Sequence, residues 1–317
     1  MKNSHLTYIG GSAISSLGGG IMDYYNSIKE LIIDNELTKK SKDYSKNKSE
    51  VYTYYNVGKL LKEAGKCYGD NIIGEYSNKL VVEVGKKYNR RTLFRMRQFY
   101  NLFENQKVSR LATQLSISHY IELLPLKDIN EINYYIDVCK RNNLTRDELR
   151  ERIKNKEYER LDEDTRNKIV SNEELELVDT VKNPILIRNT TGVDNISEKM
   201  LQKLILEDLN EFLDELGDGY SYVKNEYKIK IGDSYNYIDL LLFNYIYNAF
   251  VVVELKVTEL KKEHIGQTLL YMNYIDEHIK SVSQNKTIGI IIVKVDNKFV
   301  MHYYKEGRMI SREYELI

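Results

Sequence analysis

Three ionisable residues interrupt two apolar segments of this chain. Asp239 lies within Tyr-Ile-Asp-Leu, while Glu254 and Lys256 lie within a later Val-Val-Glu-Leu-Lys. Both segments are typical of buried strands, where a charge without a partner is costly. The charges therefore need a compensating role, and a metal-dependent phosphodiesterase site explains all three.

Strand geometry predicts how these side chains meet. Side chains alternate between the two faces of a strand, so Glu254 and Lys256 share one face. A short turn separates the two strands, which brings Asp239 close to Glu254. Two such carboxylates repel each other, and Mg²⁺ (or Mn²⁺) would remove that cost, with the Leu255 carbonyl as a further ligand. Lys256 would orient or deprotonate the attacking water, or stabilise charge on the phosphate.

A purely structural interpretation stands beside this one. Glu254 and Lys256 would then form an ordinary salt bridge, and Asp239 would cap a turn. The tripeptide Glu-x-Lys is common by itself. Charges placed in two apolar strands favour the metal site.

The surrounding residues predict an α/β domain at 196–317. The expected element order is αβββαβ with a mixed sheet, followed by a terminal hairpin. The first element is a helix that begins at the N-cap Ser197 and ends at 217–219. It is followed by strands at 220–231, 235–245 and 250–257, a helix at 259–281, a strand at 287–295, and a hairpin of 299–304 with 309–314.

The segment 21–156 predicts a separate α-helical domain, because apolar residues recur three and four positions apart. Thr92 and Ser116 are expected N-caps, and Pro125 ends the helix that Ser116 begins. Short helices in tandem favour a helix-turn-helix or winged-helix-like arrangement, so the whole chain is predicted to be an α+β two-domain protein.

Residues outside these domains have weaker patterns. Residues 1–20 are expected to form a flexible tail rather than a signal peptide. The charged segment 157–195 is expected to connect the domains, and 183–187 within it to dock on the second one.

Composition limits the class of protein. Lys+Arg and Asp+Glu number 47 each, so only local patches can attract a polyanion. Cys67 and Cys139 match no zinc or redox spacing, and no apolar run is long enough to span a membrane. A reducing, cytoplasmic location fits best.

One local patch is strongly basic. From 86 to 110 the chain has eight basic residues and one acid, with aromatic residues between them. Arg91 and Arg95 lie one helical turn apart, and backbone N–H groups at the helix start also favour phosphate. The candidate nucleic-acid contacts are Lys87, Arg90, Arg91, Arg95 and Arg97. A solvated basic face with the aromatic side chains in the core is the alternative.

Asp239 with Glu254-Leu255-Lys256 resembles the PD-(D/E)xK nuclease motif, with Ile238 in place of its proline. Across most of the chain the sequence is similar to the YhcG-like family of PD-(D/E)xK nuclease domain proteins. The matching segments are Asn-Arg-Arg-Thr-Leu-Phe-Arg-Met-Arg-Gln-Phe-Tyr at 89–100, Ser-Ile-Ser-His-Tyr at 116–120, Glu-Leu-Leu at 122–124, Phe-Leu-Asp-Glu-Leu-Gly at 212–217, Val-Glu-Leu-Lys at 253–256, and Gly-Gln at 266–267 with Tyr271 and Asn273. The resemblance implies a restriction-endonuclease-like fold behind a helical DNA-binding domain.

The resemblance also suggests further site residues. Proteins of this kind often add a Gln or an acid from the helix after Glu-x-Lys, which here is Gln267. Tyr271 lies one turn later on the same face and is a candidate contact to nucleic acid. Many relatives carry an acid on the first helix, and among Glu207, Asp208, Glu211 and Glu215 we favour Glu215. A solvated or packing role is the alternative for each.

The sequence thus predicts a magnesium-dependent endonuclease acting on nucleic acid, most simply DNA. A catalytically silent nucleic-acid-binding or complex-forming protein that retains the nuclease fold is the alternative. The choice between DNA and RNA stays open. So does the oligomeric state, although a homodimer would let such a domain cut two strands.

Overall fold

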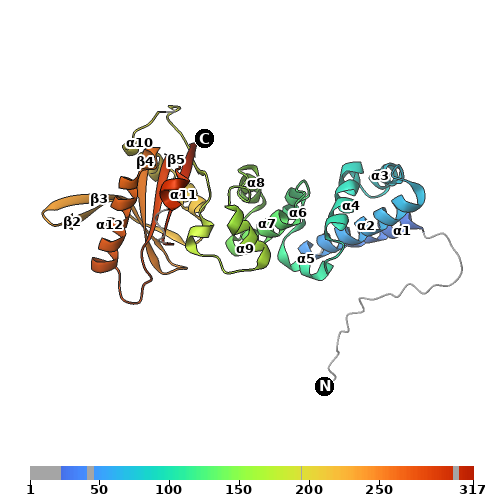
Figure 1. Cartoon of the computed structure of the whole chain (residues 1–317). Helices are drawn as coiled ribbons and strands as arrows, with labels where there is room; N and C mark the ends of the chain where they lie inside the picture. Colours follow the sequence, from blue (N-terminus) through green and yellow to red (C-terminus); the bar gives the residue numbers. More distant parts are fainter. Residues whose placement is uncertain (1–22, 41–45, 194, 303–306) are drawn as a thin grey trace, which may run out of the picture. The chain divides into compact units, whose positions relative to one another are not determined.

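The computed structural model describes residues 23–40, 46–193, 195–302 and 307–317 (Figure 1). The predicted tail at 1–20 lies outside the described residues. The chain forms two compact units: Met1–Lys127 with Val138–Arg146, and Asp128–Asp137 with Asp147–Ile317. Helix α7 (Ile129–Asn142) contributes to both units.

The described part of unit 1 is helical. Its helices are α1 (Tyr24–Lys40), α2 (Lys46–Tyr68), α3 (Ile72–Glu83), η1 (Lys86–Tyr88), α4 (Arg90–Phe103), α5 (Val108–Gln114) and α6 (Ile117–Leu123). No strand occurs among these residues, so the wing of a winged helix is not found in the part of unit 1 that the structure describes. The amphipathic faces of α1 to α4 meet in one core, which includes Ile28, Leu61, Leu80 and Leu93.

The predicted caps in unit 1 are partly corrected. Asn89, not Thr92, is the N-cap of α4, because its Oδ1 accepts a hydrogen bond from the Thr92 backbone N–H at 3.2 Å. Ser116 is the N-cap residue of α6, as predicted. Its Oγ contacts His119 Nδ1 at 2.7 Å instead of a backbone N–H.

Unit 2 is built on a mixed six-stranded sheet. The strand order is β1-β6-β5-β4-β3-β2, in which β2, β3 and β4 pair antiparallel and β4, β5, β6 and β1 pair parallel. The strands are β1 (Ile185–Ile187), β2 (Tyr220–Ile231), β3 (Ser234–Asn244), β4 (Ala249–Glu259), β5 (Ile288–Val295) and β6 (Met309–Leu316). The predicted helix, three strands, helix, strand order is confirmed.

Helices cover both faces of this sheet. On one face, α10 (Glu198–Glu207) and α11 (Leu209–Leu216) pack on residues such as Leu240, Val253 and Leu255. On the other face, α12 (Lys262–His278) packs on Leu241 and Val252. The helix predicted from Ser197 is therefore two helices that meet at Asp208. Ser197 caps the first, accepting from the Met200 N–H at 3.2 Å.

The sheet divides where the motif residues lie. β3 pairs with β4 only from Leu240 to Asn244. The part of β3 that precedes Leu240 pairs with β2 alone, while β4 continues past Val253 beside β5. The outer part of the β2–β3 hairpin therefore projects from the body of the domain (Figure 1). We call this point of divergence the fork.

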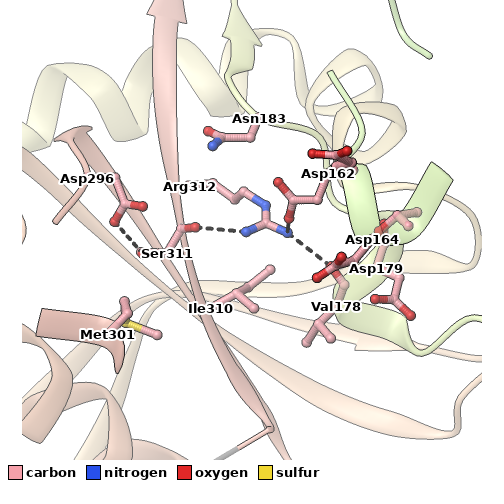
Figure 2. A pocket seen from close by; sticks show the side chains of 12 residues that line it. Asp162, Asp164, Val178, Asp179, Asn183, Asp296, Met301, Ile310, Ser311 and Arg312 are labelled. Carbon is pink, nitrogen blue, oxygen red and sulfur yellow. Dashed lines mark hydrogen bonds and ion pairs between the residues drawn. The ribbon is translucent and has the colours of Figure 1, made fainter. Parts of the chain in front are cut away.

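The segment predicted as a connection is structured and belongs to unit 2. It contains α9 (Glu163–Ser171), η2 (Leu177–Thr180) and β1, which pairs with β6. Arg312 of β6 is 8% exposed, and its guanidinium donates to the Val181 carbonyl at 3.0 Å. It also donates to Asp162 Oδ2 at 2.8 Å (Figure 2). Arg312 and Asp162 border a cavity of about 510 Å³. None of the sequence-predicted site residues lines it.

The expected terminal hairpin is wrong. Residues Lys298–His302 form the short helix α13, and β6 pairs in parallel with β5 and β1 instead. Residues 303–304 of the predicted hairpin lie outside the described residues. No helix within the described ranges is long and apolar enough to cross a membrane.

Gly58 sets the approach of α2 to α4. A Cβ on Gly58 would overlap the Met96 carbonyl oxygen and lie 2.8 Å from Tyr100 Cβ. Gly58→Ala should therefore force the two helices apart and destabilise unit 1 by roughly 3 kcal/mol. Calorimetry of the full chain should show a lowered unfolding transition.

Gly65 of the same helix is the matched control. The nearest atoms to a Cβ there are 3.7 Å away, so Gly65→Ala should leave unit 1 as stable or slightly more stable. Equal effects of the two substitutions would contradict the predicted close approach.

Candidate functional site

Asp239 lies at the fork and bridges its two branches. Because β3 has left β4 there, the Leu255 backbone N–H has no ladder partner on that side, and Asp239 Oδ2 accepts it at 2.8 Å. Gln202 of α10 donates to the Asp239 carbonyl at 2.9 Å. Burial raises the pKa of the Asp239 carboxyl, and the hydrogen bond from Leu255 lowers it by less.

Glu254 and Lys256 lie on the other branch, and they form a pair as the spacing predicts. Glu254 is 2% exposed, and its Oε1 lies 2.8 Å from Lys256 Nζ. Burial, followed by the nearby Asp239 charge, raises the pKa of Glu254 to about 7. Burial acts to lower the pKa of Lys256, but the carboxylates of Glu254, Asp239 and Glu198 outweigh it and the pKa is raised. Lys256 is thus held as a cation.

The other carboxylate oxygen of Glu254, Oε2, lacks a hydrogen-bond partner among the described residues. It is also buried. An unpaired buried carboxylate oxygen is costly, and a cation would satisfy it.

The donor set suits a hard cation. No group of three or more His, Cys, Asp or Glu side chains able to hold a metal occurs in the described residues. Mg²⁺, however, is commonly held by one or two carboxylates with waters and substrate oxygens. Asp239 and Glu254 with the Leu255 carbonyl fit that description, although the carbonyl already accepts from Lys256 Nζ at 3.1 Å.

Glu198 of α10, the first helix of the αβββαβ domain, is the helical acid that approaches the site, and it was not among the residues predicted from the sequence. Its Oε2 lies 3.4 Å from Lys256 Nζ, and it follows the N-cap Ser197 in the first turn of α10. Its charge also acts on the pKa values of Asp239 and Glu254. The cap at Ser197 was visible in the sequence, but which end of the helix faces the fork was not.

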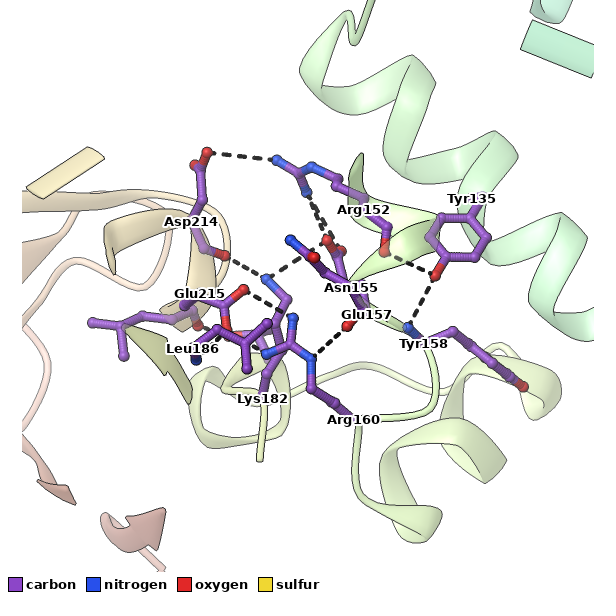
Figure 3. A network of polar contacts seen from close by, with 12 residues as sticks. Tyr135, Arg152, Asn155, Glu157, Tyr158, Arg160, Lys182, Leu186, Asp214 and Glu215 are labelled. Atoms are coloured by element: carbon purple, nitrogen blue, oxygen red, sulfur yellow. Dashed lines mark hydrogen bonds and ion pairs between the residues drawn. The ribbon is translucent and has the colours of Figure 1, made fainter. Parts of the chain in front are cut away.

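Glu215, the sequence choice for that acid, is placed elsewhere. It lies at the end of α11 and forms a bidentate pair with Arg160, including a 2.9 Å bond from Nη2 to Oε1. Its Oε2 also accepts from the Leu186 N–H at 2.9 Å (Figure 3). The two oxygens thus hold Arg160 and strand β1, which corrects the assignment of Glu215 to the site.

The α12 candidates have different surroundings. Gln267 is half-buried, and its Nε2 donates to the Tyr271 hydroxyl at 2.8 Å. Tyr271 is 3% exposed and belongs to the core under α12. The charges of Glu254 and Asp239 act on its pKa, which burial raises. Gln267 and Tyr271 thus border the site, but a buried Tyr271 offers no open surface to nucleic acid, which corrects that expectation.

The basic candidates in unit 1 separate into two kinds. Lys87 pairs with Glu36, and Arg97 pairs with Asp70 and lies 4.9 Å from the Phe94 ring centroid. Arg90 is exposed beside the same ring, Arg91 is exposed, and Arg95 is half-buried; none of these three has an ion pair among the described residues. The ion-paired residues are thus partly neutralised.

Comparison with known families gives two matches. Residues 178–314 match the YhcG PDDEXK nuclease domain, and residues 22–160 match the DUF1016 N-terminal domain. The YhcG protein of Escherichia coli (strain K12) is 24% identical, with 83% of this chain and 82% of the relative covered. These matches confirm the predicted resemblance.

Two solved structures are similar to part of this chain. A repair endonuclease from Pyrococcus abyssi is 17% identical over 40% of this chain and 49% of its own, with a TM-score of 0.27. A complex of EndoMS with double-stranded DNA is 20% identical over 41% and 49%, with a TM-score of 0.30. The present chain therefore covers about half of each of these structures.

The raised pKa of Glu254 predicts how stability depends on pH without divalent ions. The unfolded carboxyl ionises near 4.5 but the folded one only near 7, so the folded state keeps a proton that the unfolded state has lost. Stability should fall as pH rises through this window, by on the order of 3 kcal/mol. In Glu254→Gln this fall should be smaller.

Urea titrations from pH 4.5 to 8 in EDTA measure how the free energy of unfolding changes with pH in the wild type and in Glu254→Gln. The slope, not the absolute stability, is the readout because the substitution also removes a partner of Lys256. Addition of Mg²⁺ or Mn²⁺ at pH 8 should raise the Tm of the wild type more than that of Glu254→Gln. Identical pH slopes would show that Glu254 ionises normally.

Proposed function

We propose that this chain, whose two parts match the DUF1016 N-terminal domain and the YhcG PDDEXK nuclease domain, is a metal-dependent endonuclease that hydrolyses phosphodiester bonds of DNA. The observation that carries the proposal is the half-buried Asp239 beside the buried Glu254 at the fork, with one Glu254 oxygen left without a partner among the described residues. This arrangement is unfavourable in an isolated domain and becomes favourable with a divalent cation and a phosphate.

Asp239, Glu254 and the Leu255 carbonyl are the residues that would hold Mg²⁺ or Mn²⁺. When bound there, the ion would polarise the scissile phosphate and lower the pKa of a water. Asp239 would keep its position through the hydrogen bond from Leu255, which fixes one oxygen and leaves the other for a ligand. Glu254 would supply its unpartnered Oε2.

Lys256 would act as a fixed cation. Its raised pKa keeps the ammonium protonated at neutral pH, which favours charge stabilisation and orientation over proton abstraction. Of the roles considered for this residue, we therefore propose that it donates hydrogen bonds to the attacking water or to the phosphate oxygens. Glu198, 3.4 Å from Nζ, would position the ammonium, and Gln267 would border the substrate side.

The helical front domain would bind the nucleic acid through α4. Exposed Arg90 and Arg91 are available for phosphate at the start of this helix, with Arg95 one turn further on. Lys87 and Arg97 would first have to leave their carboxylate partners Glu36 and Asp70. We therefore assign the main contacts to Arg90, Arg91 and Arg95.

The nuclease proposal is tested by nicking of supercoiled DNA with Mg²⁺ or Mn²⁺. Asp239→Ala should lower the rate by roughly 100-fold or more, because it removes a cation ligand and the bridge across the fork. Glu198→Gln should lower it by about tenfold, as expected for a positioning group. Glu277→Gln, which removes an exposed acid at the far end of α12, should nick like the wild type. Metal-independent nicking, or equal rates for wild type and Asp239→Ala, would remove the proposal.

The role of α4 is tested by the salt dependence of binding. Arg91→Glu with Arg95→Glu should weaken DNA binding by about tenfold and reduce the slope of log K against log salt by about 2. Lys59→Glu with Lys66→Glu changes the net charge equally on the exposed side of α2 and is the control. Equal effects of the two double variants, measured by fluorescence anisotropy, would mean that overall charge and not this surface governs binding.

A further inference from the structure

The outer part of the β2–β3 hairpin is a separate structural feature beside the site. We call residues 225–238 the hairpin arm. Beyond the fork its strands pair only with each other, in the register Lys228↔Tyr237 and Lys230↔Tyr235. The arm projects from the body of the domain (Figure 1). It has no role in the proposed chemistry described so far.

The two sides of the arm differ in composition. Ile229 and Ile238 are buried and pack with residues of α12. The opposite side presents Tyr235 and Tyr237, which are 56% and 52% exposed. Packing therefore explains the first side, whereas the second leaves two aromatic rings in solvent.

Lysines flank these exposed rings. Lys228 and Lys230, opposite the two tyrosines in the register, are exposed and have no ion pair among the described residues. Lys228 Nζ lies 3.7 Å from the Tyr235 ring centroid. Aromatic rings interleaved with uncompensated lysines form a surface on which bases can stack while phosphates are neutralised.

The exposed rings favour unpaired bases over a duplex. In a duplex the base faces are stacked on one another, and only base edges and the backbone can be reached from outside. Unpaired bases offer their faces to aromatic side chains. Tyr237, and Tyr235 when Lys228 moves from its ring to a phosphate, are thus suited to stacking with a single strand.

The arm also lies at the correct place along the substrate. Tyr237 and Tyr235 precede Asp239 by two and four residues on β3, or about 7 and 14 Å along an extended strand. A nucleotide stacked on Tyr237 would therefore be close to the phosphodiester bond that the Asp239 site would cut.

We propose that the hairpin arm binds unpaired nucleotides next to the scissile phosphodiester, and that the preferred substrates carry a single-stranded segment at the cleavage point. This inference rests on the proposed nuclease function for the meaning of the site, but the binding surface itself does not require catalysis.

Binding of two DNA probes in EDTA by the full chain tests the inference. One probe is a duplex with a single-stranded flap that carries 2-aminopurine at the junction; the other is the fully paired duplex. Tyr235→Ala with Tyr237→Ala should weaken flap binding by at least about tenfold and remove the quenching of 2-aminopurine. Duplex binding should change by less than about twofold.

Two controls separate stacking from other causes. Tyr235→Phe with Tyr237→Phe keeps both rings and should retain flap affinity. Tyr245→Ala removes a tyrosine that is 66% exposed at the opposite end of β3, and it should bind like the wild type. Photo-crosslinking of wild-type protein to a flap containing 5-iodouracil needs no substitution and should map to the arm.

The outcomes distinguish the two proposals. Unchanged flap binding in the double Ala variant, an equal loss for duplex and flap, or crosslinks only outside the arm would overturn the inference and leave the nuclease proposal intact. Flap binding that depends on the tyrosines, without cleavage of any probe in Mg²⁺ or Mn²⁺, would overturn the nuclease proposal and support the arm as a binding surface.

Discussion

The divergence of β3 from β4 is the constraint on which the site depends. A continuous ladder would satisfy the Leu255 N–H with a backbone carbonyl and leave no space between the strands. At the fork the Asp239 carboxylate takes that role across a 2.8 Å hydrogen bond. The same divergence frees the arm to project and leaves Glu254 facing Asp239. One change of strand pairing thus produces the carboxylate pair and the surface beside it.

At the fork, each charged or polar group offsets part of the free-energy cost of burying another. Lys256 offsets one oxygen of Glu254, Leu255 offsets one oxygen of Asp239, and Glu198 supplies a partly exposed acid for the ammonium. One Glu254 oxygen remains without compensation among the described residues. Buried polar atoms without a partner are frequent at functional sites, where a bound ligand supplies the missing interaction. Elsewhere in unit 2, Arg160 and Arg312 have their donors matched by carbonyls and carboxylates.

Much of the site could be predicted from the sequence because its motif is local. Alternation along β4 fixes Glu254 and Lys256 on one side, and a short turn brings Asp239 to them. The first-helix acid could not be chosen, because Glu198 and Glu215 lie on consecutive helices whose direction against the sheet depends on tertiary packing. The prediction of a terminal hairpin failed for the same reason, because the apolar pattern of β6 does not reveal that its partners are β5 and the distant β1. The segment 157–195 looked like a linker because it is rich in charged residues and lacks strong periodicity, although Leu177, Val181, Ile185 and Ile187 join the hydrophobic core.

The short strand β1 has a consequence for how the domain avoids self-association. The parallel side of the sheet ends on a strand of only three residues, and β1 occupies the edge of β6 that would otherwise expose a row of unpaired backbone groups. Long open edges recruit other strands, whereas very short ones give them little to extend. A fragment cut at 196 would lose β1 along with the carbonyls that hold Arg312, and it would expose an eight-residue edge beside a buried cation. The integrity of the nuclease domain thus depends on residues that precede its motif by more than fifty positions.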